Sequence, residues 1–374
     1  TQHLQSVVDG GRDETTRYGT SLDYVMTLDL HRMGLLPGAI VGVRAESILG
    51  SSVNRSARTI LPVNTDLAFP LSGPGGEDVD LALTELTYTQ FLSEHVALFM
   101  GKLNTLGGDP NEFASGRGMF QFSNSDFVFN PVTALTVPYS TLGAGILWIP
   151  SENLTIVASV FNTVDASTTS GFDDFGDGWT LSVEAQTRHQ LHGLPGGQNF
   201  GFVYADDGNY LRITGRLTFE PGVGLEIPRS DDSYALYWSG WQYLWTAEAD
   251  DSPIDTSNGR PDRRGIGVFA RSGFGDDDTL PVEWHVSGGI GGRGLIPGRP
   301  DDHFGIGYGY SAISNGRLSG LTGGGKGEAQ GAEAFYSIAV SPSAAMSFSA
   351  QAYDDVNRRS DTSIILGARL NIRF

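Results

Sequence analysis

The sequence of 374 residues contains no cysteine, which excludes a disulfide framework, a thiolate metal site and a cysteine nucleophile. It also has no apolar run near the roughly 18 residues that a membrane-spanning helix needs. The longest candidates are stretches like residues 143–149. Helical membrane proteins are therefore excluded. Envelope proteins that cross an oxidising periplasm unfolded often lack cysteine, so the composition is compatible with export.

Basic residues are scarce, with 24 lysines and arginines against 43 acidic residues and a net charge of −19 at pH 7. Such a chain repels nucleic acid, and we expect no nucleic-acid partner. Charged residues make up only 18% of the sequence, while 20 Phe, 13 Tyr and 6 Trp are present. A disordered chain would be charge-rich and poor in aromatics, so this one is expected to fold.

No helical stripe of period 3.6 persists over three turns, but period-2 alternation recurs along the chain. Between residues 22 and 30 the even positions are all apolar, while Asp23, Thr27 and Asp29 are polar. The polar faces favour Ser, Thr, Gln and Gly over the Lys and Glu of a soluble sandwich. If the apolar face meets lipid, every backbone group must be paired and the sheet must close. The pattern therefore predicts an all-β transmembrane antiparallel β-barrel.

Connections between the predicted strands alternate between short ones, such as 33–38 and 192–197, and long ones, such as 52–78 and 104–137. Short periplasmic turns opposite long external loops are typical of barrels in the bacterial outer membrane. Counting the alternating segments predicts 16 strands in a single domain over residues 1–374, the first strand being truncated at its N-terminal end. The loop over residues 104–137 is long enough to fold inward and constrict the pore.

Aromatic residues stand near the ends of several predicted strands, as an aromatic girdle at the membrane interfaces requires. Examples are Trp148, Trp179, Trp241 and Tyr243. The chain ends in Phe374 after alternating apolar positions, which resembles the signal that barrel-assembly machinery recognises. We therefore expect this machinery as a partner.

Residue patterns that carry catalysis or bind metals are missing. The seven histidines form no cluster with metal-ligand spacing, and no GxSxG elbow occurs. Acidic pairs such as Asp173 and Asp174 recur in connections. We interpret them as solvated loop charge, with divalent-cation bridging to lipopolysaccharide as the alternative. We expect no metal, no cofactor and no enzymatic activity.

The segment GKLNTLGGDPNEFASGRGMFQFSN at residues 101–124, followed by FNP, VPYSTLGAG and the later GLIPGRPDD, resembles the carbohydrate-selective porin family, the OprB-like porins. The resemblance extends over nearly the whole chain. It implies a sixteen-stranded barrel in the bacterial outer membrane that passes sugars such as glucose. It also implies external loops that fold inward and narrow the pore.

A sugar ring needs hydrogen-bonding side chains at its edges and flat aromatics at its faces. In the predicted inward loop, Arg117 lies between Gly116 and Gly118, so its side chain is free to project across the lumen. The alternative is a salt bridge to a wall carboxylate such as Glu85. Any of the candidates could instead brace the loop. Those facing the lumen by parity, or lying in the loop, are Arg44, Glu46, Glu85, Asp109, Asn111, Arg117, Gln121, Asn124, Gln242 and Arg271.

Three functions compete at this point. The first is passive, substrate-selective diffusion of neutral mono- or oligosaccharides into the periplasm. The second is a non-selective or anion-preferring porin, because Arg44, Arg188 and Arg271 could attract anions. The third is a barrel enzyme acting on envelope lipid or a secreted polysaccharide hydrolase, for which no signature is present. The expected partners are small sugars, outer-membrane lipid and lipopolysaccharide, with the chain acting as a monomer or homotrimer.

Overall fold

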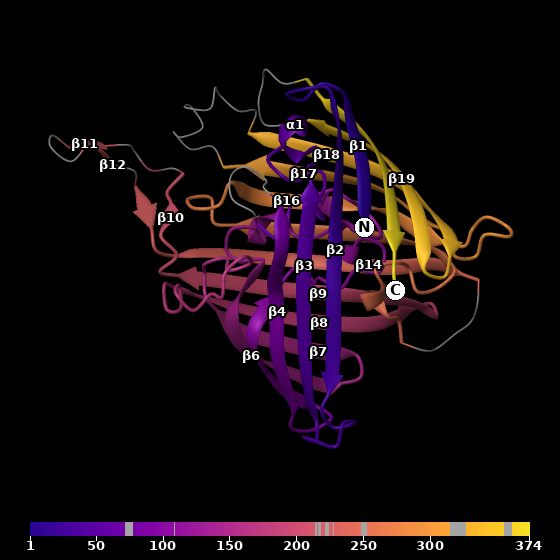
Figure 1. Ribbon diagram of the computed structural model, residues 1–374, viewed down its shortest axis with the longest axis horizontal. Helices are drawn as coiled ribbons and strands as arrows, with labels where there is room; N and C mark the ends of the chain where they lie inside the picture. Colours follow the sequence, from indigo (N-terminus) through magenta and orange to yellow (C-terminus); the bar gives the residue numbers. More distant parts are fainter. Residues whose placement is uncertain are drawn as a thin grey trace.

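A computed structural model of the protein describes residues 1–71, 78–107, 109–213, 215, 218–220, 224–226, 228–247, 253–314, 327–354 and 361–374. In these residues, sixteen antiparallel strands pair in chain order into one closed barrel (Figure 1). The predicted barrel and strand number are confirmed. The barrel strands are β1 (Gln2–Asp9), β2 (Thr15–Asp29), β3 (Ala39–Gly50), β4 (Val79–Phe91), β5 (Val96–Asn104), β6 (Ser140–Ser151), β7 (Leu154–Phe161), β8 (Trp179–Leu191), β9 (Leu194–Asp206), β14 (Ser233–Thr246), β15 (Gly265–Gly275), β16 (Val282–Arg293), β17 (His303–Ile313), β18 (Glu328–Ser341), β19 (Ala344–Asp354) and β20 (Ser363–Ile372).

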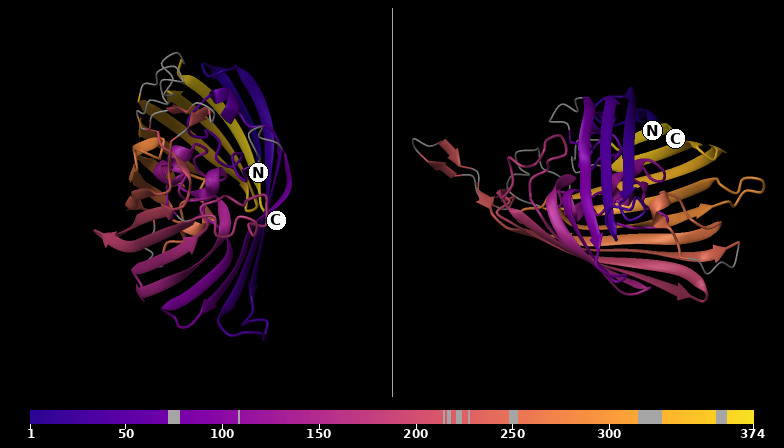
Figure 2. Two further views of the ribbon diagram at one scale, coloured as in Figure 1. Left: turned by 90° about the vertical axis from the view of Figure 1, so that its left-hand side faces the viewer. Right: turned by 60° about the horizontal axis from the view of Figure 1, so that its bottom comes forward.

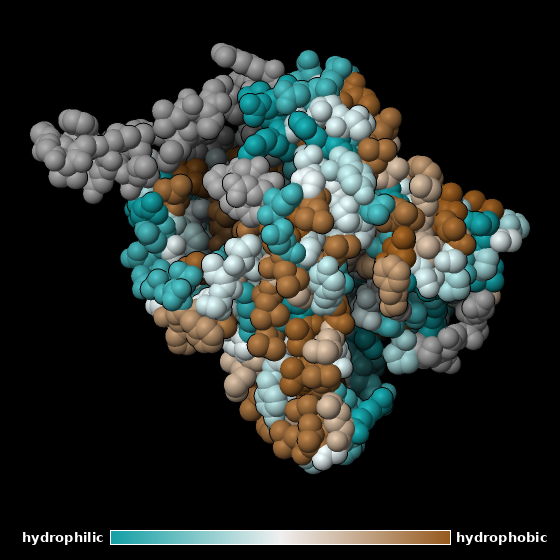
Figure 3. All heavy atoms as spheres, viewed as in Figure 1, coloured by the Kyte–Doolittle hydropathy of each residue, from teal (hydrophilic) through white to brown (hydrophobic). Residues whose placement is uncertain are grey.

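The two ends of the sheet meet at β1, which pairs with β2 on one side and with β20 on the other. Closure leaves no unpaired edge, as a sheet surrounded by lipid requires. Side chains alternate between the two faces. On β17, Ile306 and Tyr308 are exposed on the outer face, whereas Gly307 between them lies against Phe127 inside the barrel. Apolar side chains also gather on the outer face of β2, β3 and β4 (Figure 3).

The connections differ in length between the two ends of the barrel, as the sequence predicts. Most connections at one end are short and most at the other are long. An exception is the connection between β14 and β15, residues 247–264, which is long although it lies at the end with the short turns. The short turns are 30–38, 92–95, 152–153, 192–193 and 342–343, and the long loops are 51–78, 105–139, 162–178 and 207–232.

The remaining elements lie in these connections. The loop after β9 carries two small hairpins and extends away from the barrel (Figure 2). None of the helices in the described ranges is long and apolar enough to cross a membrane. These further elements are α1 (Asn54–Ala57), β10 (Tyr210–Leu211), β11 (Thr218–Glu220), β12 (Gly224–Glu226), β13 (Arg229–Ser230) and the 3₁₀ turns η1 (Gly116–Gly118), η2 (Ser125–Phe127), η3 (Pro131–Thr133) and η4 (Thr256–Asn258).

A buried aromatic cluster occupies part of the barrel interior. Phe122 and Phe127 of the loop between β5 and β6 pack there against Phe269 of β15 and Phe335 of β18. The rings of Phe122 and Phe335 meet edge to face, with centroids 4.9 Å apart. Gly305 of β17 makes room for the loop, because a Cβ atom there would lie 2.7 Å from the Phe122 ring. The loop therefore folds into the barrel, as predicted.

Candidate functional site

The loop between β5 and β6, residues 105–139, is called the inner loop below. One tie between this loop and the barrel wall is Arg271 of β15. Its Nε donates a hydrogen bond to Asp109 Oδ2 at 2.5 Å, its Nη1 donates to the Phe127 carbonyl at 2.8 Å, and its Nη2 donates to the Ala114 carbonyl. The Arg271 side chain is 0% exposed. It therefore braces the loop from within the wall and does not face solvent.

Two other wall residues hold the middle of the inner loop. Glu333 of β18 accepts hydrogen bonds from the backbone N–H groups of Ser123 and Asn124, at 2.9 and 2.8 Å. Arg369 of β20 donates to the carbonyl of Gln121 at 2.6 Å. Buried loop backbone lacks the partners that a neighbouring strand would give, so the wall side chains supply them.

Three of the predicted site residues are buried inside this framework. Asn111, Gln121 and Asn124 are each 0% exposed. Asn111 donates to a serine hydroxyl of β14 at 3.1 Å, and Gln121 Oε1 accepts from the Ser115 N–H at 2.5 Å. Asn124 caps η2 by accepting from the Asp126 N–H at 3.0 Å. These side chains brace the loop, which is the alternative role that the sequence left open for them.

Arg117 is, like Asp109, a charged residue of the inner loop that lines the open space described below. Its backbone is left-handed, with a φ of 58°. Nη1 donates to Asn104 Oδ1 at 2.8 Å, and Nη2 donates to Glu46 Oε1 at 2.7 Å and to the Tyr139 hydroxyl at 2.5 Å. Burial lowers the pKa of Arg117, but Tyr139 and Glu46 raise it above its ordinary value, so the group stays charged. The wall carboxylate that pairs with Arg117 is Glu46 and not Glu85.

Two acids of the inner loop have pKa values shifted toward neutrality. Glu112 is buried, and burial raises its pKa to about 8. Its Oε1 accepts hydrogen bonds from the Tyr243 hydroxyl and the Asp262 N–H, both at 2.5 Å. Burial, together with the nearby Glu333, raises the pKa of Asp126 to about 7. The loop therefore carries less negative charge at neutral pH than its sequence suggests.

The wall beside Arg117 presents a second set of paired charges. Arg44 of β3 donates to Asp23 Oδ1 of β2 at 2.7 Å, and its Nε lies 4.0 Å from Glu85 Oε2 of β4. All three side chains are partly exposed to the barrel interior, between 18% and 29%. Asp23 was not among the predicted site residues. Its position on the polar face of the segment over residues 22–30 is the signal that could have identified it.

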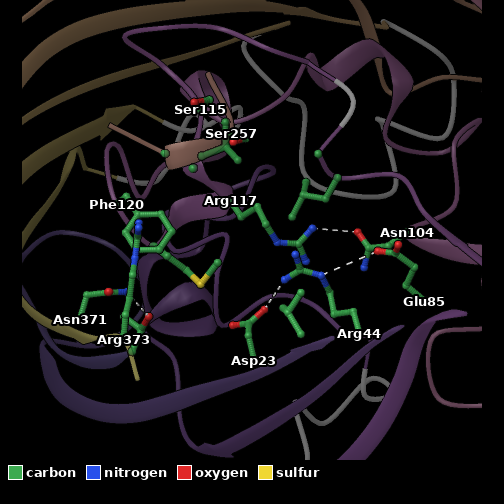
Figure 4. Close-up of a pocket in the computed structure, with 18 of the residues that line it drawn as sticks. Asp23, Arg44, Glu85, Asn104, Ser115, Arg117, Phe120, Ser257, Asn371 and Arg373 are labelled. Carbon is green, nitrogen blue, oxygen red and sulfur yellow. Dashed lines mark hydrogen bonds and ion pairs between the residues drawn. The ribbon is translucent and has the colours of Figure 1, made fainter. Parts of the chain in front are cut away.

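These two charge clusters line one cavity of about 830 Å³. Of the predicted residues, Arg44, Glu85, Asp109 and Arg117 line it, and Glu46 holds Arg117 from behind. Figure 4 shows Arg117 and Arg44 projecting into the cavity, with Asp23, Glu85 and Asn104 in the same region and Phe120, Asn371 and Arg373 on another side. The volume lies within the range of small-molecule sites. The cavity extends from mid-height of β2–β4 to the barrel end where β1 begins and β20 ends.

Gln242 does not face this cavity, contrary to the parity argument. On β14 the inward side chains are Trp241 and Tyr243, which pack against Phe113 of the inner loop. Gln242 lies on the opposite face, where it donates to the Leu194 carbonyl at 3.1 Å. Both faces of this strand carry large aromatics, so alternation alone does not identify the inner one. Trp241 and Tyr243 therefore support the inner loop and do not belong to an outer girdle.

Comparison with known proteins agrees with this architecture. A sequence model of the carbohydrate-selective porin, OprB family, matches residues 13–374. The high-pH structure of Pseudomonas putida OprB is 17% identical in sequence to this chain and gives a TM-score of 0.81. The match covers 100% of this chain and 92% of the chain of that structure. The low-pH structure of the same protein is 14% identical, with 100% and 90% coverage and a TM-score of 0.57. The DcaP channel of Acinetobacter baumannii is 10% identical, with 100% and 94% coverage and a TM-score of 0.53. No curated protein sequence matches the chain.

Proposed function

Because the chain belongs to the carbohydrate-selective porin, OprB family, we propose that it lets small neutral sugars diffuse passively along the cavity between the inner loop and β2–β4. It is a porin of the bacterial outer membrane and not an enzyme. The proposal of this particular route rests on one observation, namely that Arg44 and Arg117, from two neighbouring ion pairs, line the same open cavity.

The pairing of these charges suits a neutral, hydroxylated solute. Arg44 is paired with Asp23, and Arg117 with Glu46, so the cavity offers guanidinium donors and carboxylate acceptors without an excess of either sign at these pairs. Sugar hydroxyls can both donate and accept, and can therefore use both groups. Passage also requires that the solute bind weakly enough to leave again.

The same pairing disfavours an anion-preferring channel. That alternative depended on Arg44, Arg188 and Arg271 attracting anions. Arg44 faces two carboxylates, and Arg271 is fully buried against Asp109. Neither is available as a free positive charge for an anion in the path, and Arg188 of β8, which is exposed, lies outside the lining of this cavity.

Planar-bilayer recordings of the purified protein test this function. Under a potassium chloride gradient we expect a reversal potential close to zero, because the cavity charges are paired. On addition of a neutral monosaccharide we expect a concentration-dependent fall in current beyond the effect of viscosity. A reversal potential near the chloride equilibrium value, with no effect of sugar, would instead support the anion-preferring porin.

We also propose that Phe374 is recognised during barrel assembly. It lies two residues beyond Ile372, the last residue of β20, and its side chain is exposed. Replacing Phe374 by serine should lower the amount of folded protein in the outer membrane. Immunodetection in membrane fractions measures this quantity, and a normal amount of Phe374→Ser would contradict the proposal.

Contacts with outer-membrane lipid and lipopolysaccharide, and a monomeric or homotrimeric state, complete the proposed set of partners. The exposed apolar side chains on the outer face of the strands support the lipid contact. The mass of the detergent-extracted protein distinguishes the two oligomeric states.

A further inference from the structure

The connection between β14 and β15 is anchored inside the barrel, although it lies at the end with the short turns. Its residues 253–264 are described. Ile254 is buried in a cluster with Phe113 and Trp241. Arg293 at the end of β16 donates to the Asp262 carbonyl at 2.9 Å. The segment is therefore fixed to the wall and held within the barrel.

The same connection packs directly on the inner loop. The Asp262 N–H donates to Oε1 of the buried Glu112 at 2.5 Å, which joins the two segments by a hydrogen bond. Gly259 has a φ of +65°, and a Cβ atom there would lie 2.4 Å from Phe120 and 3.2 Å from the Cα atom of Gly116. Gly116 precedes Arg117, so the connection contacts the turn that presents the Arg117 guanidinium to the cavity.

Part of the connection also lines the cavity itself. Thr256, Ser257 and Gly259 line it together with Arg44 and Arg117. Ser257 is exposed, and its hydroxyl and N–H both donate to Asp255 Oδ1, at 2.5 and 2.9 Å, which fixes the short turn η4. Ser115 of the inner loop lines the same cavity, and Figure 4 shows Ser257 in a different part of it from Asp23 and Glu85.

We propose that residues 253–264 form the periplasmic wall of the solute path. A solute that has passed Arg117 leaves between this connection and the inner face of β2. The exit side then offers the hydroxyls of Thr256 and Ser257 to the solute, whereas the middle of the path offers paired charges. This inference rests on the proposed function only for the nature of the solute. The position of the wall is inferred from two observations. The connection contacts Glu112, Phe120 and Gly116 of the inner loop, and part of it lines the cavity.

The natural absence of cysteine allows a direct test, because a single introduced thiol is the only one in the chain. Ser257→Cys is inserted into a planar bilayer, and a cationic methanethiosulfonate reagent is added on the periplasmic side. We expect a stepwise loss of current, and a slower reaction when a neutral monosaccharide is present. Glu94→Cys is the control. Glu94 is exposed in the connection 92–95 at the same end of the barrel and is not a lining residue of this cavity.

Modification of Ser257→Cys, confirmed by mass, with an unchanged current would overturn the proposal, and so would a thiol that the reagent does not reach. An equal loss of current in Glu94→Cys would also overturn it, because the effect would then not depend on the connection. Thr256→Cys serves as the second variant if Ser257→Cys does not insert. Failure of the proposed function would give a different result. Sugar would then have no effect on the current of the protein before modification, while the loss of current on modification of the thiol would still show that the connection lines the path.

Discussion

Replacing Arg271 by methionine is expected to lower the free energy of unfolding by about 3–5 kcal/mol, the usual cost of removing one partner of a buried ion pair. The Arg271 side chain is 0% exposed and binds three separate points of the inner loop. Methionine would fill part of the space but leave the Asp109 carboxylate and the carbonyls of Ala114 and Phe127 without their donor. Urea unfolding in lipid vesicles, followed by tryptophan fluorescence, measures the loss.

Arg32→Met is the matched control for this substitution. Arg32 lies in the turn 30–38 with its side chain 86% exposed, and it pairs with Asp29 at 3.2 Å. Exposed pairs of this kind are worth about 0–1 kcal/mol. If Arg271→Met were no more destabilising than Arg32→Met, the inner loop would not depend on this tie.

Arg117→Ala is expected to raise single-channel conductance and to weaken sugar block by about tenfold or more. Removing the guanidinium enlarges the cavity and removes donors whose hydrogen bonds, being charged, are worth about 1.5–3 kcal/mol each. The substitution also leaves Glu46 without its partner, which adds negative charge beside the path. Single-channel recording with a sugar titration measures both quantities.

Arg32→Ala is the control for Arg117→Ala, because Arg32 lies in the turn 30–38, its side chain is 86% exposed and it is outside the residues that line the cavity. It should leave conductance and sugar block close to those of the unaltered protein. Unchanged conductance and unchanged block in Arg117→Ala would remove this residue from the constriction. Larger conductance with noisy gating and unaltered block would assign Arg117 a bracing role alone.

The barrel was predictable because its physical requirements appear directly in the sequence. Lipid on one side and water on the other force a strict alternation of side chains, as between residues 22 and 30. The inward fold of the loop over residues 104–137 was predictable from its length and from the family resemblance. The two glycines that flank Arg117 predicted a side chain near the lumen, and its ion pair with a wall carboxylate is the alternative that the sequence left open.

The roles of individual polar residues were less predictable. Asn111, Gln121 and Asn124 satisfy backbone and side-chain groups within the folded loop, and a sequence does not show which carbonyls or N–H groups a loop leaves unpaired. Gln242 was assigned to the wrong face because Trp241 and Tyr243 fill space under the inner loop, so large aromatics here mark the inside.

The inward position of the connection between β14 and β15 had no signal in strand periodicity. Its contacts with the inner loop join residues far apart in sequence, such as Glu112 and Asp262. Parity and loop length do not encode such tertiary contacts. The partner of Arg117 is unpredictable for the same reason, since Glu46 and Glu85 are both inward-facing carboxylates on neighbouring strands.

Sugar-driven swelling of liposomes that contain the purified protein tests the central claim most directly. A neutral monosaccharide and an amino acid of similar size are supplied at equal osmolarity, and the initial swelling rates are compared by light scattering. The cavity with paired charges predicts faster swelling with the sugar. Equal rates for the two size-matched solutes would contradict sugar-selective diffusion through this barrel.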